Sequence, residues 1–135
     1  MAKRILVVDD SFVMRTLIKD ILSSDPDLTV VGESANGGDA LEKVKLLSPD
    51  VVLLDIEMPE VDGIEFLKRL KLVSPCKVLV VSSVAQVGSP KALEARRLGA
   101  FDIISKPSGA LSLDLKTKKG SDIVIMTRRA AGLPE

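Results

Sequence analysis

Apolar residues gather in five short runs along the chain, and segments with helical periodicity separate them. The clearest run is Val51 to Leu54, where four apolar β-formers follow one another without polar alternation. Such a run is typical of a strand covered on both faces. The predicted strands are residues 4–8, 28–33, 51–54, 77–81 and 101–104. Strands that alternate with helices form βαβ units, so the pattern predicts an α/β fold with one doubly wound, five-stranded parallel sheet and helices on both faces.

The first two predicted helices carry apolar stripes at helical spacing. The first stripe consists of Val13, Leu17, Ile18, Ile21 and Leu22, and the second of Ala40, Leu41, Val44 and Leu47. Asn36 precedes the second stripe at the position of a helix cap. Because residues three or four positions apart lie on one face of a helix, we expect both stripes to face the sheet.

The later helices are indicated by their end signals. Asp62 and Glu65 have capping-box spacing, and Ser89 with the following proline opens a helix that Gly99 closes. A last helix is expected over roughly the second half of residues 111–131.

Composition indicates one cytoplasmic domain and excludes several kinds of chemistry. The 135 residues contain 19 Lys and Arg, 19 Asp and Glu, and no His. Zero net charge gives no reason to expect nucleic acid or a membrane as partner, and the apolar run after the N-terminus is too short to span a bilayer. The absence of His removes Ser-His and Cys-His catalysis and His-ligated metals. Cys76 is the only cysteine and is interpreted as a packing residue. We expect one domain over residues 1–131 and the start of a linker at 132–135.

Acidic residues come directly after two of the predicted strands. Asp9 and Asp10 follow the first strand and Asp55 follows the third, and right-handed crossovers place these strands side by side. Three converging carboxylates favour a hard cation such as Mg²⁺. We expect Asp10, Asp55 and a backbone carbonyl to hold this ion, with Asp9 acting through water.

The fourth strand ends at Ser82 and the fifth at Lys106, so the same edge gains a hydroxyl and an ammonium group. A metal, a rigid carboxylate, a hydroxyl and a lysine together form a phosphoryl-transfer site with Asp55 as the nucleophile. Each residue alone has an ordinary interpretation: an aspartate after a strand is often a cap or turn residue, and surface lysines are common. Their occurrence on one edge favours function.

Four groups of residues resemble the receiver domains of bacterial two-component response regulators. They are Val7-Val8-Asp9-Asp10-Ser11, Leu54-Asp55-Ile56-Glu57-Met58-Pro59 with Asp62-Gly63, Val81-Ser82-Ser83, and Gly99-Ala100 with Lys106-Pro107. The resemblance implies a flavodoxin-like sheet of order 2-1-3-4-5 and a cis peptide between Lys106 and Pro107.

The resemblance also assigns roles. Asp55 is similar to the phosphoacceptor, Asp9 and Asp10 to the acid pair, and Glu57 to the residue whose carbonyl binds Mg²⁺. Ser82 corresponds to the switch hydroxyl and Lys106 to the phosphate-contacting lysine. The implied partners are a histidine kinase and an output domain, and the resemblance allows phosphorylation-dependent self-association. Ile103 occupies a position that is commonly aromatic in receivers, while Phe101 is expected to pack in the core.

Among receivers, the chain most resembles the regulatory domain of the chemotaxis protein-glutamate methylesterase. The similar segments are Asp10-Ser11 with Met14-Arg15, Val81-Ser82-Ser83, residues 92–102 and residues 111–115. The chain has no His for the esterase triad, so methylester hydrolysis is not expected of these residues. Whether the chain counts as an enzyme through its own phosphorylation and dephosphorylation stays open.

Several alternatives remain. The chain could be a stand-alone receiver or the receiver of a DNA-binding response regulator. A haloacid-dehalogenase-type phosphatase needs a second acid two residues after its nucleophile, whereas Asp9 is followed by Asp10 and Ser11. A flavin-binding module needs a phosphate-binding loop and aromatic flanks, and the chain has no Trp or Tyr. A structural interaction domain would lack metal-dependent phosphorylation.

Overall fold

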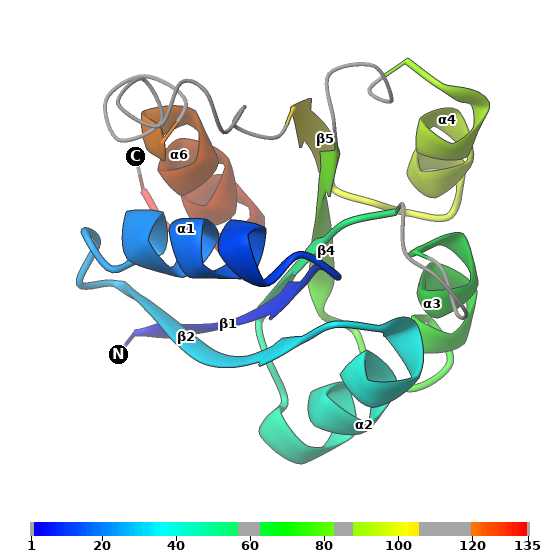
Figure 1. Cartoon of the computed structure of the whole chain (residues 1–135), viewed down its shortest axis with the longest axis horizontal. Helices are drawn as coiled ribbons and strands as arrows, with labels where there is room; N and C mark the ends of the chain where they lie inside the picture. Colours follow the sequence, from blue (N-terminus) through cyan, green and yellow to red (C-terminus); the bar gives the residue numbers. More distant parts are fainter. Residues whose placement is uncertain (1, 57–62, 83–87, 106–119, 135) are drawn as a thin grey trace.

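The five strands of the sheet are parallel and lie in the order β2-β1-β3-β4-β5 (Figure 1). The computed structural model describes residues 2–56, 63–82, 88–105 and 120–134. The strands are β1 (Lys3–Val8), β2 (Leu28–Ser34), β3 (Val51–Leu54), β4 (Lys77–Ser82) and β5 (Asp102–Ser105). Each predicted strand is confirmed with ends that differ by at most one residue, and the sheet order implied by the resemblance is confirmed as well.

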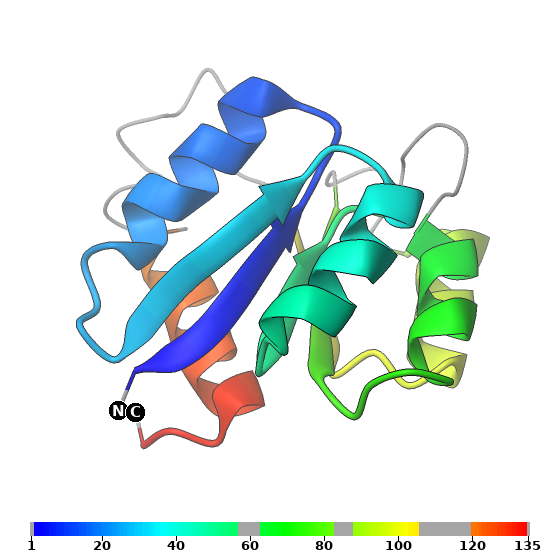
Figure 2. The same cartoon turned by 90° about the horizontal axis from the view of Figure 1, so that it is seen from below.

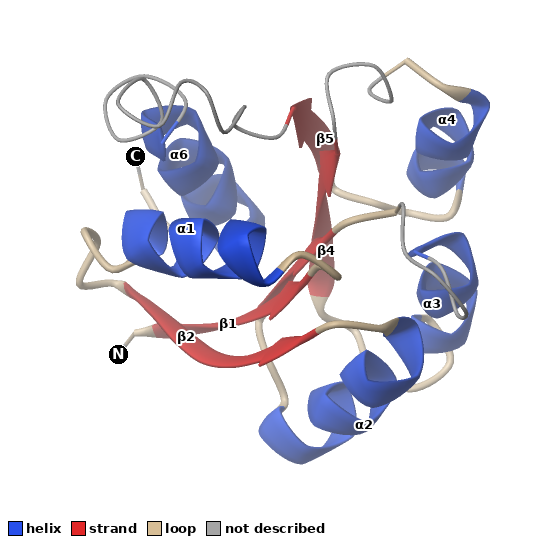
Figure 3. Cartoon of the chain, in the orientation of Figure 1, coloured by secondary structure: helices blue, strands red, loops and turns tan. Residues whose placement is uncertain are grey.

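Five helices in the described residues cover the two faces of this sheet. They are α1 (Phe12–Leu22), α2 (Gly37–Leu47), α3 (Gly63–Leu70), α4 (Pro90–Arg97) and α6 (Gly120–Ala131). Figure 2 shows α1 and α6 on one side of the sheet and the other helices on the opposite side, and Figure 3 separates the strands from the helices by colour. The expected last helix is therefore present over the second half of its segment.

The side chains of the central strand β3 alternate between two apolar clusters, one on each face of the sheet. Val52 and Leu54 join the apolar cluster under α2, α3 and α4, whereas Val51 and Leu53 join the cluster under α1 and α6. Successive side chains of a strand point to opposite faces, so a strand covered on both sides needs an apolar residue at every position. All four side chains are at most 1% exposed.

Three of the helix ends expected from the sequence are confirmed, at Asn36, at Ser89 with Pro90, and at Gly99. The Asn36 side chain accepts a hydrogen bond from the Asp39 N–H at 2.8 Å, and Ser89 Oγ accepts from the Ala92 N–H at 3.2 Å. Pro90 is the first residue of α4, where a missing N–H costs nothing. Gly99 has a φ of +101°, which glycine adopts without steric cost. In the expected capping box, Glu65 pairs with Arg69 at 3.2 Å, while Asp62 lies outside the described residues.

Two packing predictions are wrong. Val13 is 74% exposed and does not face the sheet. The buried stripe of α1 runs through Met14, Ile18 and Ile21, and Val13 turns about 100° away from Met14. Phe101 is 41% exposed; it lies just before β5, an edge strand that has β4 on one side only, so fewer elements are available to cover its ring.

Cys76 packs as expected against the cluster under α2, α3 and α4, where it is half-buried. Burial, followed by the nearby Asp50 carboxylate, raises the pKa of its thiol above the ordinary value, although hydrogen bonds around Ser74 oppose the shift. Reactivity requires the thiolate, so this environment favours an inert packing residue.

Candidate functional site

The carboxyl ends of the strands bring two predicted site residues side by side. Val8 and Leu54 are paired in the register of β1 and β3, and Asp9 and Asp55 follow them. The Asp55 N–H donates to the Val8 carbonyl at 2.9 Å, which extends the pairing to the phosphoacceptor candidate itself. Asp55 is thus held by a central strand on the side of the sheet where open α/β folds bind ligands.

Three carboxylates converge at this edge, as the sequence predicts. One oxygen each from Asp9, Asp10 and Asp55 lies within 4.8 Å of the others. Asp9 is 1% exposed and Asp55 is 2% exposed, whereas Asp10 is exposed. The cluster therefore has two fixed inner acids and one outer acid that reaches solvent.

The donor set fits a small hard cation. An octahedral Mg²⁺ with oxygens at about 2.1 Å places opposite ligands about 4.2 Å apart, close to the spread of these carboxylates. Like charges this near repel one another unless a cation lies among them. Within the described residues, the acid cluster could therefore hold a metal ion.

Hydrogen bonds to the backbone orient Asp9. Its N–H donates to the Ser34 carbonyl at 3.0 Å, which ties the end of β1 to the end of β2. One carboxylate oxygen of Asp9 accepts from the Ser11 N–H at 2.8 Å. The hydroxyl of Ser11 caps α1 by accepting from the Met14 N–H at 3.2 Å. The turn that carries Asp9 and Asp10 is therefore held by hydrogen bonds to β2 at one end and to the start of α1 at the other.

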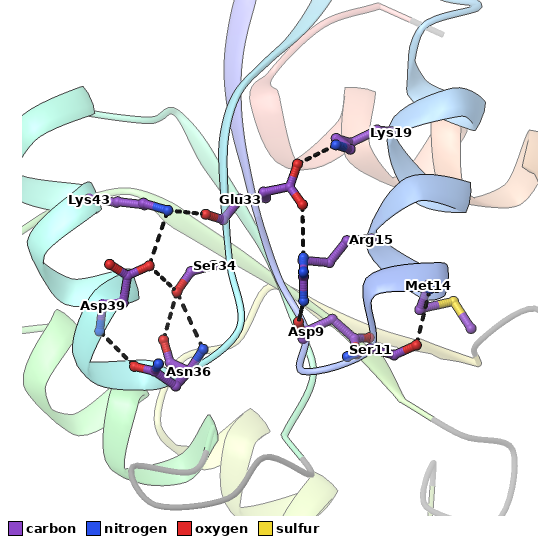
Figure 4. Close-up of polar contacts among 10 residues, drawn as sticks. All are labelled: Asp9, Ser11, Met14, Arg15, Lys19, Glu33, Ser34, Asn36, Asp39 and Lys43. Atoms are coloured by element: carbon purple, nitrogen blue, oxygen red, sulfur yellow. Dashed lines mark hydrogen bonds and ion pairs between the residues drawn. The ribbon is translucent and has the colours of Figure 1, made fainter.

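A second polar cluster lies beside this turn at the end of β2 (Figure 4). Ser34 Oγ donates to the Asn36 carbonyl and lies 2.8 Å from an Asp39 carboxylate oxygen, and Lys43 pairs with Asp39 at 3.1 Å. Hydrogen bonds from Ser34 and Lys43 lower the pKa of Asp39 despite its partial burial. The ionised Asp39 also lies in the first turn of α2, where the helix dipole favours negative charge.

Glu33 completes this cluster by binding two cations from α1. Its carboxylate accepts a hydrogen bond from Lys19 and another from Arg15 Nε, the latter at 2.8 Å. These hydrogen bonds, with Lys19 contributing most, lower the pKa of Glu33 below its ordinary value of 4.5. Neither Arg15 nor Glu33 was predicted as part of the site. A signal was present in the sequence: Glu33 lies near the end of the second predicted strand, and Arg15 and Lys19 lie on the helix that follows the first strand and its acid pair.

We predict that the protein loses stability as the pH falls, in part because protonation of Glu33 removes its interactions with Lys19 and Arg15. The pKa of Glu33 is lowered in the folded chain, so the unfolded chain takes up the proton first as the pH falls. Its contribution is present above the ordinary pKa of 4.5 and is lost as the pH falls through the lower pKa of the folded protein. Urea denaturation between pH 7 and pH 3 should therefore show a shallower loss of stability in Glu33→Gln. The control is Glu42→Gln, which removes one charge at a 70% exposed side chain; equal slopes for Glu33→Gln and wild type would contradict the prediction.

Ser82 reaches the same edge at the end of β4. It is fully buried, and its Oγ has no hydrogen-bond partner among the described residues. Ser82 pairs with Ser105 in the register of β4 and β5. Glu57 and Lys106, the other predicted site residues, lie outside the described residues, as does the Lys106-Pro107 peptide. Ile103 is 6% exposed and belongs to the core cluster.

Gly63 brings the start of α3 against the segment that carries Asp55. A Cβ at Gly63 would lie 2.4 Å from Ile56 Cα and 3.0 Å from the Asp55 carbonyl oxygen. These are backbone atoms that cannot turn aside, so only glycine fits here. The sequence motif contains Gly63, but the close backbone approach is visible only in the fold.

Comparisons with known proteins agree with this fold. Residues 5–118 match the family described as the response regulator receiver domain. The chain therefore belongs to the response regulator receiver family. It is similar to the protein-glutamate methylesterase/protein-glutamine glutaminase of Halalkalibacterium halodurans, with 53% identity over 122 residues that cover 90% of this chain and 35% of that protein. The corresponding protein of Thermotoga maritima is 48% identical, over 84% of this chain and 33% of its own length. The chain spans about a third of the length of these relatives.

Solved structures give the same result. The response regulator domain of Thermotoga maritima CheB superposes with a TM-score of 0.87 and 41% identity, with full coverage of both chains. A structure described as the P1 domain of CheA3 in complex with CheY6 from R. sphaeroides has a TM-score of 0.78 and 40% identity, and the match covers 96% of this chain and 97% of that chain. The chain is thus homologous to the regulatory domain of chemotaxis methylesterases. None of the described helices is long and apolar enough to cross a membrane.

Proposed function

We propose that Asp55 is a phosphoacceptor that takes a phosphoryl group from the phosphohistidine of a histidine kinase or from a small phosphodonor. The observation that carries this proposal is the cluster of Asp9, Asp10 and Asp55 at the carboxyl ends of two adjacent strands. A carboxylate oxygen of Asp55 attacks phosphorus while the bond to the donor imidazole breaks, which forms an acyl phosphate. The electron pair of the broken bond goes to the departing imidazole nitrogen.

We assign the magnesium ligands to Asp10, Asp55 and the backbone carbonyl of Glu57, with Asp9 bound through water. A bound Mg²⁺ supplies charge neutralisation for the phosphoryl oxygens and the surrounding carboxylates. The buried position of Asp55 holds its carboxylate in a fixed direction, whereas the exposed Asp10 completes the pocket on its solvent side. Positioning and charge neutralisation are the main requirements of phosphoryl transfer.

Ser82 and Lys106 are assigned to the phosphoryl group after transfer. The buried hydroxyl of Ser82 can donate to a phosphoryl oxygen, which would draw the end of β4 toward Asp55. Lys106 would supply a positive charge to a second phosphoryl oxygen. Ile103 is already packed in the core, so the proposed switch relies on Ser82 rather than on an aromatic side chain that changes position.

For the longer protein, we propose that phosphorylation of the receiver over residues 1–131 controls an output domain with methylesterase activity in the cytoplasm. The identity to two methylesterases over most of this chain favours this output over a DNA-binding domain or a stand-alone receiver. The complex of a CheA3 P1 domain with the similar CheY6 supports a chemotaxis-type histidine kinase as the phosphodonor.

Incubation with acetyl phosphate and Mg²⁺ tests the proposed function. Intact-mass spectrometry should show one added phosphoryl group, and omission of Mg²⁺ with added chelator should prevent the addition. Wild-type protein that remains unmodified under conditions where a known receiver is labelled would contradict the proposal.

The substitution Asp10→Ala tests whether magnesium binding can be lost while the protein remains folded. Because Asp10 is exposed and lies among like charges, we expect its removal to change stability by less than about 0.5 kcal/mol. Magnesium affinity measured by calorimetry should fall at least about tenfold, since one of few charged ligands is lost. Unchanged affinity in the folded variant would remove Asp10 from the metal site.

A further inference from the structure

Arg15 is a nearly buried cation that has no role in the proposed phosphoryl transfer. Its side chain is only 13% exposed although guanidinium groups are normally solvated. Nη1 donates to the Asp9 carbonyl at 2.7 Å, and Nε donates to Glu33 at 2.8 Å. The guanidinium carbon lies 5.7 Å from the centre of the Phe12 ring. Figure 4 shows Arg15 between Asp9 and Glu33, with its planar group directed at both.

The two acceptors of Arg15 belong to neighbouring strand ends. Asp9 follows β1, and Glu33 lies near the end of β2, an edge strand of the sheet. The Asp9 N–H donates to the Ser34 carbonyl at 3.0 Å. Lys43 of α2 donates to the Glu33 carbonyl, and Lys19 of α1 binds the Glu33 carboxylate. Arg15 therefore closes a ring of contacts that joins β1, β2 and α1 immediately beside the acid cluster.

The direction of the Arg15 hydrogen bond determines what it can do. Nη1 donates to the main-chain carbonyl of Asp9, whose carboxylate belongs to the acid cluster. The guanidinium is paired with Glu33 on one side and donates to the main chain of Asp9 on the other, so it can act on the pocket by holding the position of that main chain. The held carbonyl belongs to the peptide that joins Asp9 to Asp10. Fixing this peptide fixes the direction in which Asp10 leaves the turn.

We propose that Arg15, oriented by Glu33, is a positioning residue that sets the Mg²⁺ affinity of the pocket by holding the peptide between Asp9 and Asp10. This inference rests on the proposed Mg²⁺-dependent function. A rigid fork with two donors suits two acceptors on different strands, and a single flexible ammonium would satisfy both less well.

The test compares Arg15→Gln with Arg128→Gln. Arg128 is a matched control because its side chain is 17% exposed and pairs with Asp25 at 2.8 Å and Asp27 at 3.0 Å. These partners lie just before β2, at the opposite end of the sheet from the acid cluster. Both substitutions remove a partly buried ion pair, so both should lower the melting temperature. Only Arg15→Gln should weaken Mg²⁺ binding, by about tenfold, as expected for loss of a group that orients ligands.

Phosphorylation by acetyl phosphate at varied Mg²⁺ concentration gives a second readout. In Arg15→Gln, the Mg²⁺ concentration for half-maximal rate should rise by about tenfold, while the rate at saturating Mg²⁺ stays within about twofold of wild type. For Arg15→Lys, the Mg²⁺ concentration that gives the half-maximal rate should lie between the values for wild type and for Arg15→Gln. Wild-type Mg²⁺ affinity in folded Arg15→Gln would overturn the inference and leave the proposed function intact. Absence of Mg²⁺ binding in the wild type would overturn both.

Discussion

Asp55→Asn should abolish phosphorylation by acetyl phosphate and leave the protein folded. The amide lacks the anionic oxygen that attacks phosphorus, so the loss should be complete within detection. The backbone hydrogen bond from residue 55 to the Val8 carbonyl does not involve the side chain and is retained. Neutralising one of three clustered carboxylates also removes like-charge repulsion. Thermal denaturation without Mg²⁺ should therefore show equal or higher stability in the variant.

The control for this substitution is Asp122→Asn, which changes an exposed aspartate of α6 in the same way. It should be phosphorylated at the wild-type rate. Labelling of Asp55→Asn to the wild-type extent would exclude Asp55 as the phosphoacceptor. A large loss of stability in Asp55→Asn would instead contradict the claim that the three carboxylates repel one another in the absence of a cation.

Gly63→Ala should be strongly destabilising, because an added Cβ at Gly63 meets backbone atoms more closely than one at Gly32, Gly38, Gly88, Gly99 or Gly132. The new Cβ would meet Ile56 Cα at 2.4 Å, and relief requires α3 and the segment after β3 to separate. Overpacking against side chains costs about 1–3 kcal/mol, and a clash between backbones is expected at or above the upper end. For a domain of this size, we expect a fall of about 10 °C in melting temperature. The phosphorylation rate should fall too, because the carbonyl of Asp55 is 3.0 Å from the same Cβ.

Gly38→Ala is the matched control in the first turn of α2. Its new Cβ would have Asn36 Oδ1 as its nearest neighbour at 3.6 Å, an ordinary contact. Alanine favours the helix over glycine by about 0.5–1 kcal/mol, so this variant should be slightly more stable than wild type. A similar melting temperature for Gly63→Ala and Gly38→Ala would show that the approach of α3 to β3 is not tight.

The parts of the fold that the sequence predicts are those determined by local pattern. Val51 to Leu54 are apolar at every position because β3 lies at the centre of the sheet with helices on both faces. Asp9 and Asp55 follow paired strands, so strand order alone brings their carboxylates together. The acid cluster could therefore be predicted from spacing and the crossover rule.

The parts that were missed depend on distances between elements. Val13 fits an apolar stripe by spacing, but the angle at which α1 packs leaves it exposed. Arg15 and Glu33 are separated by 18 residues, and nothing in the local sequence shows that they meet beside Asp9. The role of Gly63 likewise depends on how closely α3 approaches β3. Such contacts are set by tertiary packing rather than by periodicity.

Locating the phosphoryl group on the wild-type chain tests the central claim most directly. Protein treated with acetyl phosphate and Mg²⁺ would be reduced with borohydride, which converts an aspartyl phosphate to homoserine, and then digested for peptide sequencing by mass spectrometry. We predict homoserine at position 55 only when both acetyl phosphate and Mg²⁺ are present. Homoserine at another aspartate, with residue 55 unmodified, would contradict the account.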